Sequence, residues 1–145
     1  MPEAALAMRW GLLFGAGIVA ANLVLQFVLT PLLPWQLIGL LSVAAWFACV
    51  VAAGVFAGRT GSLRAAAGAA LIAAAVDALR SAAVALAVGI PILPSAGPHI
   101  APTPGLIVAG NVVEFMLIGP LAAAIGVAAA RLTRRPSAPN AMAGD

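Results

Sequence analysis

The chain has 145 residues, of which 64% are hydrophobic and 8% charged, and its mean hydropathy is +1.15. A soluble domain of this length needs a polar surface around its core, and four acidic and seven basic side chains cannot supply one. The composition therefore excludes a water-soluble globular protein. It predicts an all-α, polytopic membrane protein whose apolar surface faces lipid.

Four apolar runs are long enough to span a hydrocarbon core, which takes about 20 residues at about 1.5 Å each. They predict a four-transmembrane-helix bundle with helices at about 10–30, 36–58, 63–89 and 105–132. These helices form a single transmembrane domain over residues 1–135. The segment 136–145 is rich in Pro and Ala and lacks periodicity, so we expect a disordered cytoplasmic tail.

Local signals define the connections between these runs. The turn 58–64, Gly-Arg-Thr-Gly-Ser-Leu-Arg, is tight, and either Thr60 or Ser62 can cap the third helix. Residues 90–104 carry five prolines and predict an irregular loop. Pro120 predicts a kink in the fourth helix, because proline removes a backbone donor and crowds the preceding turn.

Small residues recur along the helices. Gly11-xxx-Gly15, Gly54-xxx-Gly58 and the alanine-rich third helix predict close packing between helices of one bundle rather than a dimer interface.

The basic residues are all arginines, and their placement predicts the orientation. Apart from Arg80, they all fall at the amino end, in or beside the second loop, or at the start of the tail: Arg9, Arg59, Arg64, Arg131, Arg134 and Arg135. The first and third connections contain none, so the positive-inside rule predicts an N-in/C-in topology. Arg59 and Arg64 are candidates for contacts with lipid phosphates.

The pI of about 11.2 would suggest nucleic-acid binding in a soluble protein, but membrane orientation explains the arginines better. We therefore expect the lipid bilayer as a partner and no nucleic acid. The arginine- and alanine-rich composition resembles that of bacterial membrane proteins, which predicts a multi-pass protein of the bacterial cytoplasmic (inner) membrane.

A cleaved signal peptide is the alternative for the start of the chain, with Arg9 as its charged region and cleavage at 19–21. The apolar run continues past Ala21 to Leu33, where mature sequence should have begun. We favour a first transmembrane helix and leave open whether residues 1–21 are cleaved.

Polar side chains inside the apolar runs are the most informative feature. Charges at the middle of a membrane-spanning helix cost roughly 2.5 to 3.5 kcal/mol each, so they rarely face lipid. Counting from the outer helix ends places one polar or amphipathic residue of each helix in a common layer, about 12 to 15 Å deep. Further polar residues share helix faces with these. We predict a buried intramembrane polar network of Asn22, Asp77, Arg80, Ser81, Asn111 and Glu114.

In this network we expect Arg80 to be held by Asp77 from its own helix and by Glu114 from a neighbouring one. Trp46 either offers its indole to the guanidinium or packs as an apolar side chain. Two carboxylates and one guanidinium leave a formal charge of minus one, which favours protonation, hydration or binding of a cation. The network therefore has three interpretations: glue between helices, proton or ion handling, or contact with a partner protein.

No catalytic or cofactor-binding pattern is present. The single histidine, His99, and the single cysteine, Cys49, cannot build a metal centre or a disulfide, and no HExxH, nucleophile elbow or Walker-type loop occurs. We therefore expect no metal, no cofactor and no enzymatic activity. The preferred hypothesis is a structural or accessory subunit, and the alternative is a small ion- or proton-coupled transporter or channel. Four short helices enclose little pathway alone, which favours a homo-oligomer or a membrane-protein partner.

Overall fold

The computed structural model describes residues 2–88 and 103–133, and 92% of these residues are helical. No strand occurs in these two ranges. The elements are α1 (Glu3–Val24), a π-helical segment η1 (Leu25–Leu29), α2 (Trp35–Thr60), α3 (Leu63–Val88) and α4 (Pro104–Thr133). Four helices in these ranges are long and apolar enough to cross a membrane, as the sequence predicts. The expected tail 136–145 and most of the proline-rich loop 90–104 lie outside the described residues.

The first helix begins at Glu3, well before the expected start near residue 10. Hydropathy counting misses residues 3–9 because Glu3 and Arg9 interrupt the apolar run. Between them lies a segment of good helix formers, and Leu6 and Ala7 are buried against the rest of the bundle. Tertiary packing therefore extends the helix beyond its most apolar part.

The helix ends follow from local hydrogen bonds. The Ala65 N–H donates to Ser62 Oγ at 3.2 Å, so Ser62 caps α3, whereas the Thr60 hydroxyl donates back to the Phe56 carbonyl at 2.9 Å. The Thr30 hydroxyl donates to the Leu25 carbonyl at 3.1 Å, across the π-helical segment that follows α1.

The fourth helix begins with proline. Pro104 occupies the first helical position of α4, where a missing N–H costs nothing. The helix then continues through Pro120 to Thr133.

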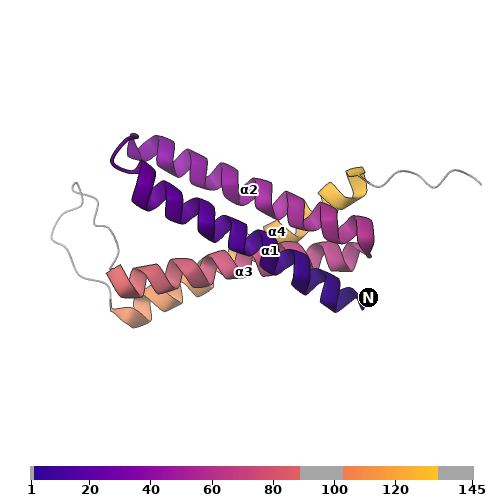
Figure 1. The fold of residues 1–145 in the computed structure, drawn as a ribbon. Coiled ribbons are helices and arrows are strands. Elements are labelled where there is room, and N and C mark those ends of the chain that lie inside the picture. The colour runs from indigo at the N-terminus through magenta and orange to yellow at the C-terminus, as the bar shows by residue number, and fades with distance from the viewer. Residues whose placement is uncertain (1, 89–102, 134–145) are drawn as a thin grey trace, which may run out of the picture.

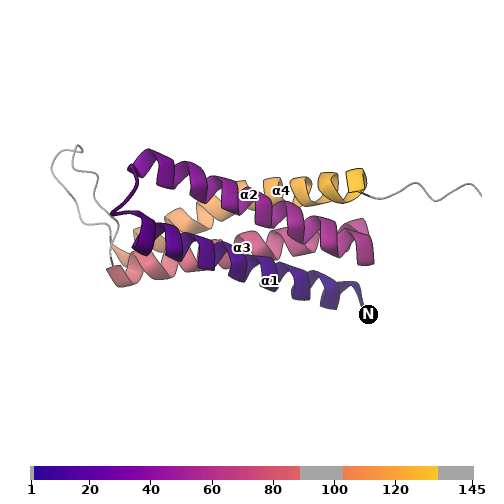
Figure 2. The ribbon, with the colours of Figure 1, turned by 45° about the horizontal axis from the view of Figure 1, so that its top comes forward.

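The bundle has two chemically distinct ends. We call one the arginine end, because it carries Arg9, Arg59, Arg64 and Arg131, and the other the proline end, because Pro31, Pro34 and Pro104 lie there. Within the described residues, α3 contacts each of the other three helices, and α1 and α4 do not touch each other. Figure 1 shows the α1–α2 hairpin separated from the α3–α4 pair at the proline end and converging with it toward the arginine end. Figure 2 shows the same bundle turned, with the N-terminus at the arginine end.

The close packing is concentrated at the arginine end. In α2, α3 and α4, every buried residue among the described side chains lies in the half of the helix nearer that end. Small residues allow this approach: a Cβ on Gly126 would lie 2.6 Å from Ala70 Cβ, and one on Gly54 would overlap the Gly126 backbone. Glycines nearer the proline end have no such neighbours, since Gly39 and Gly110 have nothing within 4 Å of a built Cβ. The bundle is thus closed at one end and looser at the other.

The glycine motif in α1 follows the same rule. A Cβ on Gly11 would lie 2.6 Å from Ile72 Cβ, and one on Gly15 would lie 2.8 Å from Val76 Cβ. The small residues predicted to bring helices together therefore pack within this single chain, which confirms that part of the prediction.

Candidate functional site

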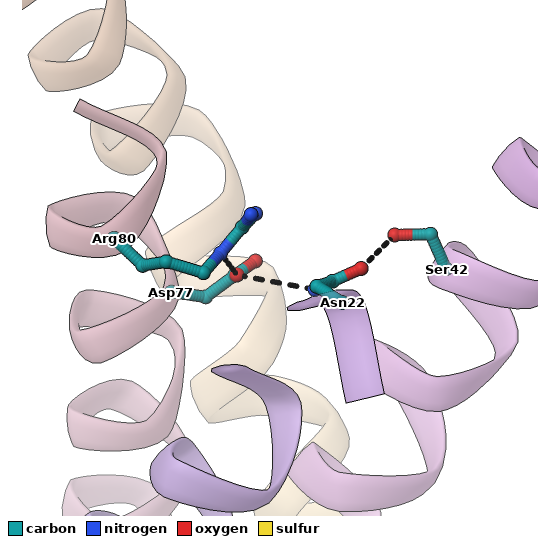
Figure 3. A network of polar contacts seen from close by, with 4 residues as sticks. All are labelled: Asn22, Ser42, Asp77 and Arg80. Carbon is teal, nitrogen blue, oxygen red and sulfur yellow. Dashed lines mark hydrogen bonds and ion pairs between the residues drawn. The ribbon is translucent and has the colours of Figure 1, made fainter. Parts of the chain in front are cut away.

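Four polar side chains from three helices form a hydrogen-bonded chain (Figure 3). By their positions along the helices they lie on the proline-end side of the close-packed region. Ser42 of α2 donates to Asn22 Oδ1 of α1, and Asn22 Nδ2 donates to Asp77 Oδ1 of α3 at 3.4 Å. Arg80 Nε donates to the same Asp77 oxygen at 2.9 Å. A single carboxylate oxygen therefore collects donors from α1 and α3, and the chain links α1, α2 and α3.

The helices position these side chains by simple spacing. Asp77 and Arg80 are three residues apart on α3, so they lie on one helix face and form an ion pair within that helix. Asn22 is the buried polar residue of α1, only 5% exposed, and it reaches α3 because that helix presents mostly alanines to its neighbours. A buried amide of this kind must be hydrogen-bonded, and both of its polar atoms are engaged here.

A cavity of about 360 Å³ adjoins this chain, between α2, α3 and α4. Part of its wall is apolar, and Trp46 and Phe115 contribute the aromatic rings. The polar part of the wall comes from three helices: Ser42, Asp77, Arg80, Ser81 and Glu114. The ion pair of α3 therefore lies at the edge of an open space, and its side chains are about one fifth exposed, 18% for Arg80 and 20% for Asp77.

Glu114 lies on α4 and lines the same cavity as the Asp77–Arg80 pair of α3. Its side chain is exposed, and within the described residues it forms no ion pair or hydrogen bond. The expected bridge from Arg80 to Glu114 is therefore not formed in the described part of the chain. The physical reason is the spread of the helices at the proline end, where Arg80 of α3 and Glu114 of α4 line a cavity instead of meeting.

The remaining predicted residues lie around this arrangement. Ser81 lines the cavity, one residue after Arg80. Asn111 is partly buried on α4, one turn before Glu114, and takes no part in the hydrogen bonds of Figure 3. Arg59 and Arg64 are exposed at the arginine end, where they can meet solvent or lipid headgroups.

Of the two roles predicted for Trp46, the structure shows the apolar one. It packs against the buried core cluster and lines the cavity, and its ring makes no cation–π contact with a described arginine; the described cation–π pair is Arg9 over Trp10.

Sequence reasoning missed Ser42. A helical serine is unremarkable by itself, but Ser42 lies one turn from Trp46 on the same face of α2, at the level already assigned to polar groups. That spacing was the available signal.

The described residues contain no group of three or more His, Cys, Asp or Glu side chains that could hold a metal ion. No protein-family model matches the chain, and no curated protein or solved structure matches it. The geometry offers two features on which a function can rest: a hydrogen-bonded polar chain across three helices, and a separate carboxylate on the wall of the cavity that adjoins it.

Proposed function

We propose that the four helices span a bacterial cytoplasmic membrane with the arginine end inside, and that the protein is a small ion- or proton-coupled carrier. The one-sided distribution of arginines supports this orientation. In that setting the cavity lies nearer the outer side, from which we expect it to be reached, and its charged residues lie within the membrane.

The observation that carries the proposal is Glu114 on the cavity wall. Asp77 and Arg80 form an ion pair, whereas Glu114 forms no hydrogen bond or ion pair with a described residue. A carboxylate at membrane depth is costly unless it holds a proton, a cation or water, and each of these can exchange. A group that serves only to hold helices together would be expected to have a protein partner.

The packing supports access from one side. Gly54, Gly126 and Ala70 bring three helices into contact on the arginine side of the cavity, which leaves no room there for a side chain as small as a methyl group. A carrier needs such a closed end, because a site open to both sides at once would leak.

The hydrogen-bonded chain favours a second candidate, a structural or accessory subunit. It joins three helices through Asn22 and Asp77, which is the arrangement expected of polar glue in a helix bundle. On this hypothesis Glu114 would be an unused surface residue or a contact with a partner protein.

Flux measurements separate the two candidates. Purified protein is reconstituted into vesicles that hold a pH-sensitive dye, and a pH gradient is imposed across the membrane. The carrier proposal predicts dissipation of the gradient by the wild type, loss of flux in Glu114→Gln and Asp77→Asn, and retained flux in Glu3→Gln, which neutralises an exposed carboxylate at the arginine end. If none of the four well-folded proteins dissipates the pH gradient, the carrier proposal is wrong and the structural subunit remains.

A further inference from the structure

The charge balance of the cavity wall defines the class of ligand that it suits. Asp77 and Arg80 form an ion pair through Asp77 Oδ1 and Arg80 Nε, so their charges largely cancel. Glu114 then gives the wall an unbalanced negative charge. Within the low-dielectric surroundings of a membrane, this charge favours a positive ligand over a neutral or negative one.

The rest of the wall argues against a bare metal ion. Hard divalent cations need six or more oxygen ligands, and the described residues offer no cluster of three carboxylate, histidine or cysteine side chains. A cavity of about 360 Å³ is also far larger than one ion, and it lies within the range of roughly 300 to 1,000 Å³ that holds small organic ligands.

The aromatic and aliphatic wall matches an organic cation. Trp46 and Phe115 contribute rings to a lining that is otherwise largely aliphatic. A ring face attracts a positive charge, most strongly where water is excluded, and the apolar wall would bury the body of the ligand. Arg80 also has terminal nitrogens with no hydrogen-bond partner among the described residues, so an oxygen on the ligand would find donors there.

We infer that the cavity binds a monovalent organic cation, with its ammonium group at Glu114 and its apolar body against Trp46 and Phe115. This inference rests on the proposed function, because it names the solute that would occupy the carrier site. The juxtaposition that carries it is one unpartnered carboxylate and two aromatic rings on a single cavity wall.

The test is isothermal titration calorimetry on the purified full chain. Benzyltrimethylammonium is the probe, and benzoate is its counterpart of opposite charge with a similar ring. The wild type should bind the cation saturably and at least about tenfold more tightly than benzoate. Glu114→Gln should weaken binding of the cation by at least about tenfold, and Trp46→Leu by about threefold, whereas Glu3→Gln should leave it unchanged.

Each outcome bears on the inference. Equal affinity for the two probes, no binding of the cation, or undiminished binding in Glu114→Gln would each overturn it. The wild-type comparison needs no variant, and Glu114→Gln is expected to fold because Glu114 is exposed and forms no hydrogen bond or ion pair with a described residue. If the cation fails to bind while pH-driven flux persists, the inference of an organic cation is wrong and the carrier proposal is retained. If neither binding nor flux is observed, the organic-cation inference and the carrier proposal are both wrong.

Discussion

Adding one methyl group at Gly126 should weaken the closed end of the bundle, and adding it at Gly110 should not. The Cβ of Gly126→Ala would lie 2.6 Å from Ala70 Cβ and 3.0 Å from the Ala66 carbonyl oxygen. Carbon atoms normally pack at about 3.5 to 4.0 Å, so α3 and α4 would have to move apart by about an ångström. Gly110 lies on the same helix and has nothing within 4 Å of a built Cβ.

The magnitude follows from comparing the two variants. Replacing a helical glycine with alanine gains about 0.8 to 1.0 kcal/mol of helix propensity at either position, and this gain cancels in the comparison. Overpacking a tight contact costs about 1 to 3 kcal/mol. Gly126→Ala should therefore be about 1 to 3 kcal/mol less stable than Gly110→Ala.

Reversible unfolding in mixed micelles, by titration with a denaturing detergent, measures this difference. Combining Gly126→Ala with Ala70→Gly removes the clashing methyl group and should restore part of the loss, because the two positions touch and their effects are not additive. Equal stability of Gly126→Ala and Gly110→Ala would refute the close approach of α3 and α4 at the arginine end.

Two further predictions concern the polar groups. Arg80→Ala should destabilise the protein by about 1 to 3 kcal/mol, because it strands the Asp77 carboxylate; adding Asp77→Ala should recover part of this loss, and simple additivity in detergent melts would show that the two are not coupled. Ser62→Ala should cost about 0.5 to 2 kcal/mol in the same unfolding titration, since it removes the cap of α3, whereas Thr60→Ala should cost much less; a reversed order would contradict the capping assignment.

The sequence predicts the number and approximate extent of the helices well, because apolar run length is a strong signal for a membrane-spanning element. It also predicts which small residues allow close contact, since glycine and alanine spacing directly limits how near two backbones can lie. The early start of α1 at Glu3 escapes this reasoning, because it depends on packing of Leu6 and Ala7 rather than on hydropathy.

The candidate site is predictable in part. Spacing of three residues on one helix brings Asp77 and Arg80 together, and that contact is local. The relation of Arg80 to Glu114 is not local: counting residues gives the level of each group along its helix, but the angle between helices decides whether they meet. Helices that are apolar all round carry little information on which face points inward, so the cavity between α2, α3 and α4 could not be foreseen.

Thiol labelling at Ser81 tests the central claim, an aqueous cavity open on one side only, most directly. In a Cys49→Ala background, cysteine replaces Ser81 on the cavity wall, Leu79 on the exposed face of α3 or Ala70 in the closed end. A membrane-impermeant methanethiosulfonate is then added to either side of oriented membranes. The account predicts reaction at Ser81→Cys from the outer side alone, and none at Leu79→Cys, where hydrocarbon suppresses the thiolate, or at Ala70→Cys. Labelling of Ser81→Cys from the arginine side, or no more labelling there than at Leu79→Cys, would contradict it.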